Sequence, residues 1–114
     1  MADFVIRRWE LAHYPGYQAP PHVHERGDEA FCVLRGRLRV LVGDEWVRLG
    51  PGDHVTVPAG TTHTFATDDE SGADVLAVMT PEIDELVTAL HTATDEQGRA
   101  AVWSRYHAHP VELP

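Results

Sequence analysis

Hydrophobic residues fall in short runs along most of the chain, and stretches rich in glycine and proline separate these runs. In one run Leu38, Val40 and Val42 share one face of a strand, while Arg37 and Arg39 lie on the other. Short strands at close spacing, divided by turn residues, indicate an all-β barrel or sandwich. The runs that predict strands cover residues 4–13, 30–34, 38–42, 46–49, 54–58, 63–66 and 75–79.

The last third of the chain has a helical pattern instead. Thr80 is a suitable N-cap and precedes Pro81, a residue favoured in the first turn of a helix. A second helix is predicted over residues 95–106, and residues 107–114 are expected to be irregular. The barrel would then span about residues 4–80 and the C-terminal helical segment about residues 81–107. An apolar stripe on the first helix would cover the open side of the barrel, a dimer seam or a partner; it comprises Ile83, Leu86, Val87 and Leu90.

Length and charge narrow the classes of function. A chain of 114 residues can bury one hydrophobic core, so a single domain over residues 1–114 is expected. Its formal net charge of −9 disfavours nucleic acid and anionic membranes as partners. The chain has no lysine, which excludes Schiff-base chemistry. The lone Cys32 cannot form an internal disulfide, and no apolar run resembles a leader or a membrane span, so a cytoplasmic protein is expected.

Candidate chemistry centres on the histidines, of which the chain has eight. His22 and His24 are two positions apart, so a strand would place both imidazoles on one face. A turn through residues 26–28 can return Glu29 to the same side, and His63 begins another predicted strand. Three imidazoles and one carboxylate suit a divalent transition metal and leave coordination positions open. The remaining histidines are expected at the surface or behind the ligands: His13, His54, His91, His107 and His109.

Two motifs with fixed spacing contain these four residues. The first reads Gly16-YQAPP-His22-Val-His24-ERGD-Glu29-AFCVLR-Gly36, and the second reads Gly52-DHVTV-Pro58-Ala-Gly60-TT-His63-TFA-Thr67. Together they resemble the two motifs of the cupin superfamily, in particular its small single-domain, quercetin-dioxygenase-like members. The resemblance covers about residues 14–81, and the fifteen residues between the motifs match the short spacing of bacterial cupins. Thr67 is the one departure, because the family has an asparagine there, which is not a metal ligand.

The resemblance implies a fold and a ligand set. The fold is a single-domain jelly-roll barrel of antiparallel strands with a metal near one mouth. The implied ligands of one divalent transition metal ion are His22, His24, Glu29 and His63. These residue types do not distinguish between Fe, Mn, Ni, Co and Zn as the bound metal. By the habit of the family, a homodimer is also expected.

A substrate pocket is predicted beside the metal. Its candidate residues are Phe31, Val33, Phe65, Tyr17 and Gln18. The first three share a strand face with Glu29 or His63, although the same positions suit the barrel core, and in so small a barrel wall and core overlap. The last two precede the ligand loop, where they would contact a substrate or belong to the surface. The three tryptophans are interpreted as packing or dimer-contact residues: Trp9, Trp46 and Trp103.

Three functions remain as hypotheses. The leading one is a metal-dependent dioxygenase that acts on a small enolisable or aromatic substrate, with Glu29 as a base when its carboxylate leaves the metal. The second is a non-redox cyclase or isomerase in which the metal polarises a carbonyl. The third is a non-catalytic module that binds a metal or a small ligand. Open coordination positions favour an enzyme over a passive binder.

Overall fold

Two antiparallel sheets form the body of the protein in the computed structural model, which describes residues 3–114. The predicted domain also includes residues 1 and 2, which lie outside this range. The first sheet has the order β1 (Val5–Leu11), β8 (Ala73–Met79), β3 (Glu29–Gly36), β6 (His54–Val57). The second has the order β5 (Glu45–Leu49), β4 (Leu38–Val42), β7 (His63–Thr67), β2 (His22–His24), β9 (Ala108–Pro110). The all-β jelly-roll prediction is therefore confirmed.

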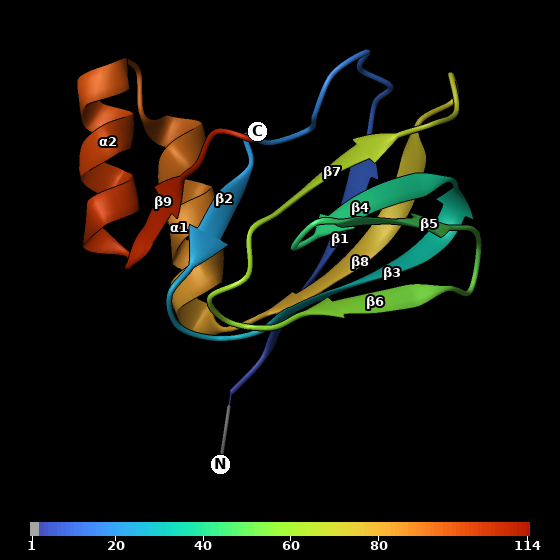
Figure 1. Cartoon of the computed structure of the whole chain (residues 1–114), viewed down its shortest axis with the longest axis horizontal. Helices are drawn as coiled ribbons and strands as arrows, with labels where there is room; N and C mark the ends of the chain where they lie inside the picture. The colour runs from blue at the N-terminus through green and yellow to red at the C-terminus, as the bar shows by residue number, and fades with distance from the viewer. Residues whose placement is uncertain (1–2) are drawn as a thin grey trace.

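The two sheets lie against each other (Figure 1), and the hydrophobic core lies between them. Most of the strands contribute alternate residues to it, because successive side chains of a strand point to opposite faces. On β8, for example, Ala73, Val75, Ala77 and Met79 are all fully buried, whereas the residues between them are half-buried. The second sheet supplies the facing side chains, among them Leu38, Val40 and Phe65.

Two helices follow the barrel, as the sequence predicts. Helix α1 spans Pro81–Thr92, and the Oγ1 atom of Thr80 accepts a hydrogen bond from the Ile83 amide at 3.2 Å. Helix α2 spans Glu96–Arg105 and begins with Asp95 as its N-cap. Ile83 is buried in the barrel core and Leu86 in a second, smaller cluster, so the apolar stripe of α1 covers the barrel. No helix within residues 3–114 is long and apolar enough to cross a membrane.

The C-terminal tail contains a strand that the sequence pattern does not predict. Residues 108–110 form β9, which pairs with β2 at the open end of the barrel. The prediction of an irregular tail is wrong at these positions. The sequence Ala-His-Pro has no hydrophobic alternation, and its strand character comes from main-chain pairing with a distant segment. Figure 1 shows α1, α2, β2 and β9 gathered at the same end of the molecule.

Candidate metal centre

Four side chains converge at the open end of the barrel, from three strands. His22 and His24 project from β2, Glu29 begins β3 and His63 begins β7. Their ligand atoms all lie within 4.8 Å of one another, and all four residues are buried. The two-residue spacing on β2 places both imidazoles on one face, as expected from strand geometry. The structure thus brings together the four residues that the sequence motifs single out.

Main-chain carbonyls orient two of the imidazoles. The Nδ1 atom of His22 donates a hydrogen bond to the Pro20 carbonyl oxygen at 2.6 Å, and that of His63 donates to the Thr61 carbonyl oxygen at 3.0 Å. Because a carbonyl only accepts, both rings carry a proton on Nδ1, which leaves Nε2 as the nitrogen available to a metal ion. This arrangement fixes the ring orientation and the tautomer that metal-binding histidines commonly have.

The third imidazole leaves a buried polar atom without a partner. Within residues 3–114, His24 Nδ1 is buried and makes no hydrogen bond. Its Nε2 atom lies 3.5 Å from Glu29 Oε1, and His63 Nε2 lies 3.0 Å from the same oxygen. Nitrogen and oxygen donors crowded in this way fit a divalent transition ion that takes their lone pairs.

The charge states in the cluster also favour a cation. Burial lowers the pKa of His22 to about 3, and the neighbouring His63 acts in the same direction. Burial alone would raise the pKa of Glu29, but hydrogen bonding to His24 and His63 outweighs it and holds the pKa at about 2. At neutral pH, His22 is therefore neutral and Glu29 ionised, which are the forms that bind a metal.

Loop contacts hold the two motifs in register. Gly27 has a φ of +79° and turns the chain between β2 and β3, so that Glu29 faces the histidines. The Asp28 carboxylate accepts a hydrogen bond from the Ala59 amide at 2.9 Å. The Gly60 amide donates to the His24 carbonyl oxygen at 2.7 Å. The loop before His63 is thereby tied to the loop and strand that carry His24 and Glu29.

Thr67, which replaces the asparagine expected from the motif, is buried at the end of β7. Its hydroxyl oxygen lies 3.0 Å from Nδ1 of His13, within hydrogen-bond distance. It is not among the four clustered residues. The substitution therefore gives a polar contact between β7 and the segment that follows β1.

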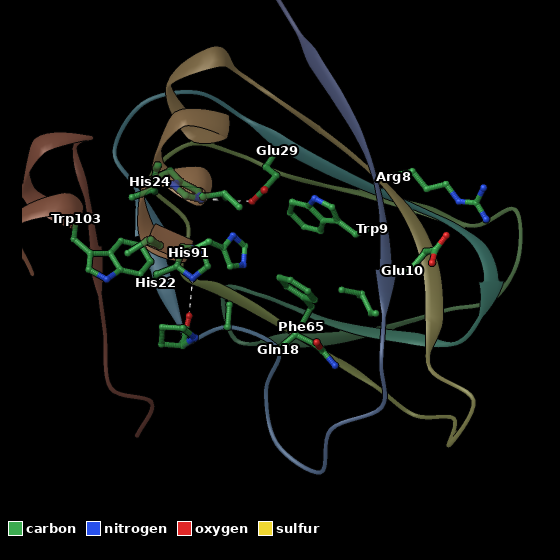
Figure 2. A pocket seen from close by; sticks show the side chains of 16 residues that line it. Arg8, Trp9, Glu10, Gln18, His22, His24, Glu29, Phe65, His91 and Trp103 are labelled. Atoms are coloured by element: carbon green, nitrogen blue, oxygen red, sulfur yellow. Dashed lines mark hydrogen bonds and ion pairs between the residues drawn. The ribbon is translucent and has the colours of Figure 1, made fainter. Parts of the chain in front are cut away.

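A cavity of about 490 Å³ adjoins the cluster, and His22, His24 and Glu29 form part of its wall. Figure 2 shows Trp9 and Phe65 on the barrel side and Trp103 on the side of the helices. Helix α1 completes the wall with Leu86, Val87, Leu90 and His91. The cavity is thus mostly apolar, with a group of metal-type donors at one place on its surface.

The predicted pocket residues divide between this cavity and other places. Phe65 and Gln18 line the cavity. Phe31 and Val33 are fully buried in the barrel core, because their positions on β3 lie deeper in the barrel than Glu29. Tyr17 stacks on Trp46 at a centroid distance of 5.7 Å, and both rings are exposed.

Sequence reasoning does not assign several residues of the cavity wall to the site. It interprets Trp9 and Trp103 as packing or dimer-contact residues, and His91 as a residue at the surface or behind the ligands. The apolar stripe of α1 is the one available signal for the helical wall, since it predicts a face that covers the open side of the barrel. No local pattern places Trp103 beside His22, where their ring centroids are 5.2 Å apart.

Comparison with known proteins agrees with this geometry. A family model described as a cupin domain matches residues 10–79, more than half of the chain. The chain belongs to the cupin family. This cupin is similar to the TT1209 protein of Thermus thermophilus, with 33% sequence identity, a TM-score of 0.56 and coverage of 67% of this chain and 69% of that one.

Two similar proteins carry names that describe an activity. Quercetin 2,3-dioxygenase of Bacillus subtilis is 36% identical over 47 residues, which are 41% of this chain and 14% of that protein. The second is a solved structure from Silicibacter pomeroyi, named a sugar phosphate isomerase from a cupin superfamily. It shares 26% sequence identity with this chain and has a TM-score of 0.54, over 68% of this chain and 48% of that one. The chain spans between 14% and 35% of the length of three curated relatives.

Proposed function

We propose that this cupin is a metal-dependent dioxygenase that acts on a small aromatic or enolisable molecule. The observation that carries the proposal is the cluster of His22, His24, Glu29 and His63, which lies on the wall of a cavity of about 490 Å³. The similarity to a protein named quercetin 2,3-dioxygenase supports this reaction class. Four protein ligands leave positions open on a five- or six-coordinate ion, as oxygen chemistry requires.

The residues of the cluster would bind the metal, orient its ligands and accept a proton. A divalent ion held by the four side chains would supply Lewis-acid activation of substrate oxygens. The hydrogen bonds from His22 and His63 to main-chain carbonyls keep both Nε2 atoms directed at the ion. Glu29 is ionised above a pKa of about 2, because His24 and His63 contact its carboxylate. When that carboxylate turns away from the histidines, these contacts are lost and Oε1 becomes a better acceptor for a substrate proton.

The cavity wall favours a flat, largely apolar substrate. Trp9 and Phe65 stack at a centroid distance of 6.1 Å and an interplanar angle of 18°, which forms an aromatic wall on the barrel side. Trp103 and Leu90 contribute apolar surface from the helices. An aromatic ring held by these groups can direct a pair of adjacent oxygens to the cluster. Catechols, flavonols and cyclic enediols have this shape and these oxygens.

Oxygen consumption tests the proposal. Protein loaded in turn with Fe²⁺, Mn²⁺, Ni²⁺ or Co²⁺ is placed in an oxygen electrode with a panel of catechols, flavonols and enediols. At least one pair of metal and substrate should give substrate-dependent oxygen uptake, and the His63→Ala variant should lose it. Conversion of a substrate by the metal-loaded protein under anaerobic conditions would contradict a dioxygenase.

His91 and a structural relative together support a second candidate, a non-redox isomerase or cyclase. The relative is named a sugar phosphate isomerase, and His91 lines the same cavity as Glu29, so the wall has a second group that can carry a proton. Such a reaction needs a polarised carbonyl and groups that move a proton. Zinc in the purified protein, with substrate conversion independent of oxygen, would favour this candidate. A non-catalytic binding module is the third, and reversible ligand binding without turnover would favour it.

We further propose that the protein is a cytoplasmic homodimer and that residues 1–114 form one domain. Strand β1 is at the edge of its sheet; Ile6 in this strand is 63% exposed, and Phe4 just before it is 66% exposed. An exposed apolar sheet edge of this kind is suited to contact with a second copy. Light scattering should give twice the monomer mass, and a monomer mass at all concentrations would refute the dimer. Cell fractionation tests the compartment.

A further inference from the structure

The strand that carries two of the candidate ligands obtains most of its main-chain pairing from the C-terminal tail. Strand β2 pairs with β7 at a single position, His22 opposite His63. With β9 it pairs at three consecutive positions, His22–Pro110, Val23–His109 and His24–Ala108. Hydrogen bonds on both sides extend this ladder, from the Glu25 amide to the His107 carbonyl at 2.9 Å and from the Val111 amide to the Pro21 carbonyl at 2.8 Å.

The side chain of His22 also rests on the C-terminal segment. Its ring centroid is 5.2 Å from that of Trp103, which is 8% exposed (Figure 2). Trp103 packs with Leu86 and Ala108 in a buried cluster separate from the barrel core. The imidazole therefore has the cluster of candidate ligands on one side and a small hydrophobic core of helix and tail residues on the other.

A sharp turn connects these two contacts. His107 follows α2 and has a φ of +57°, the only positive φ of a non-glycine residue within residues 3–114. Residues with a Cβ atom rarely adopt this conformation. Its Nδ1 atom lies 3.3 Å from the Glu82 carboxylate, which ties the turn to the first turn of α1. The turn directs the chain from Trp103 into β9, so both contacts with the ligand strand depend on it.

We propose that residues 103–111, here named the C-terminal clamp, position His22 and His24 for metal binding, so that docking of the clamp and binding of the ion stabilise each other. The inference rests on the metal site of the proposed function. The clamp lies outside residues 10–79, the part that matches the family. It fixes the backbone of β2 through β9 and the His22 ring through Trp103. Because coupling between two equilibria is reciprocal, the metal must tighten the clamp as much as the clamp tightens the metal site.

Proline substitution in β9 tests the clamp in the full chain. The bonds at Glu25–His107 and Pro21–Val111 make Val23–His109 the hydrogen-bonded pair between them, since such pairs alternate along an antiparallel ladder. His109→Pro removes the amide of that pair, whereas His109→Ala removes the same side chain and keeps the amide. Glu112→Pro places a proline just outside β9 as a second control. Loss of a group that orients metal ligands typically weakens metal binding by about 10- to 100-fold.

Titration with Co²⁺, followed by its visible absorption and by tryptophan fluorescence, gives the affinity and the coordination of the ion. His109→Pro should bind Co²⁺ at least about tenfold more weakly than the wild type, with a changed absorption spectrum. The two controls should stay within about twofold of the wild-type affinity and keep its spectrum. Wild-type affinity and spectrum in a folded His109→Pro variant would overturn the inference.

Hydrogen exchange on the wild-type protein tests the same coupling without a substitution. Co²⁺ should slow exchange of the amides of residues 107–109 and 111 more than that of the amides of β5, an edge strand that contributes no residue to the cluster. Equal effects on both segments would overturn the clamp even if His109→Pro fails to fold. Failure of the wild type to bind Co²⁺, Mn²⁺ or Fe²⁺ would instead contradict the metal site itself, and the inference would fall with it.

Discussion

The Nε2 atom of His63 lies 3.0 Å from Oε1 of Glu29, although the two residues are 34 positions apart in the chain. Glu29 begins β3 in one sheet and His63 begins β7 in the other, so this contact joins the two sheets at the open end of the barrel. His24 approaches the same oxygen at 3.5 Å. One buried carboxylate is therefore shared by imidazoles from two different strands, an arrangement that a bound cation would stabilise.

Removal of His63 should abolish tight metal binding and leave the barrel folded. The His63→Ala variant loses one of four donors, and this should weaken binding by more than the roughly 10- to 100-fold typical for an outer partner of a ligand. Calorimetric titration with Mn²⁺ or Co²⁺ measures the affinity, and circular dichroism checks the fold. His54→Ala, on the edge strand β6, is the control and should bind as the wild type does. Full metal occupancy in His63→Ala would rule out this ligand.

The metal-free protein should become less stable as the pH falls below about 6.5. The pKa of His22 drops from 6.5 to about 3 on folding, because the ring is buried. Above pH 6.5 the ring is neutral in both states and has no effect. Between pH 6.5 and 3 the His22 imidazole binds a proton in the unfolded chain but stays neutral in the native protein. The free energy of unfolding therefore falls by up to about 1.4 kcal/mol per pH unit as the pH is lowered.

Glu29 acts in the same direction at lower pH. Its pKa is 4.5 when unfolded and about 2 in the native cluster, so its stabilising contribution is complete above 4.5 and is lost as the pH falls towards 2. Urea unfolding in the presence of a chelator, at about pH 7.5 and about pH 5, measures the His22 effect. His22→Gln should flatten the dependence, whereas His54→Gln should keep it. Equal wild-type stability at both pH values would contradict the neutral buried imidazole.

At position 27, in the turn before Glu29, any residue other than glycine should lower the stability of the protein. An alanine Cβ at position 27 would lie 2.6 Å from Thr80 Cγ2 and would require a φ of +79°. Gly52 has a φ of +87° and nothing within 4 Å of the same point, so Gly52→Ala meets the backbone strain alone, about 1–2 kcal/mol. Gly27→Ala should lose about 1 kcal/mol more, because displacement of Thr80 disturbs the N-cap of α1. Urea unfolding of both variants measures the difference, and equal losses would contradict this account.

A bulky side chain in the cavity should reduce substrate turnover and leave metal binding unchanged. Leu90→Trp adds bulk to the helical wall, at a position that lines the cavity and is not among the four clustered residues. The variant should keep the metal content of the wild type and lose oxygen uptake by at least about tenfold, because the substrate no longer fits. Leu34→Trp, at an exposed site on β3, is the matched control. Undiminished turnover in Leu90→Trp would show that the substrate binds elsewhere.

The barrel and the four clustered residues can be predicted from the sequence because their signals are local. Alternation within most barrel strands predicts which side chains face the core, and Gly27 permits the turn that brings Glu29 beside His24. The Thr80-Pro81 pair likewise marks the start of α1. In each case the information lies within a few neighbouring residues, and the spacing of the motifs then relates distant segments.

The contribution of the C-terminal residues to the candidate metal centre cannot be predicted in the same way. Strand β9 has no alternation of its own, and Trp103 reaches His22 through the packing of α2 on α1 and the turn at His107. These contacts depend on how helices pack at the barrel mouth, which no periodicity specifies. For a related reason the sequence leaves Phe31 and Val33 between pocket wall and barrel core, and the structure has both buried in the core. Face alternation distinguishes inside from outside, but it does not give the depth of a residue along the barrel.

The metal content of the purified protein is the most direct test of the proposed metal centre. Protein prepared without chelators and without a metal-affinity column is analysed by elemental mass spectrometry, before and after reloading. The account predicts about one Fe, Mn, Ni or Co ion per chain, and a content near zero in His63→Ala prepared in the same way. Absence of stoichiometric metal from the wild type, even after reloading with each of these ions, would contradict the account.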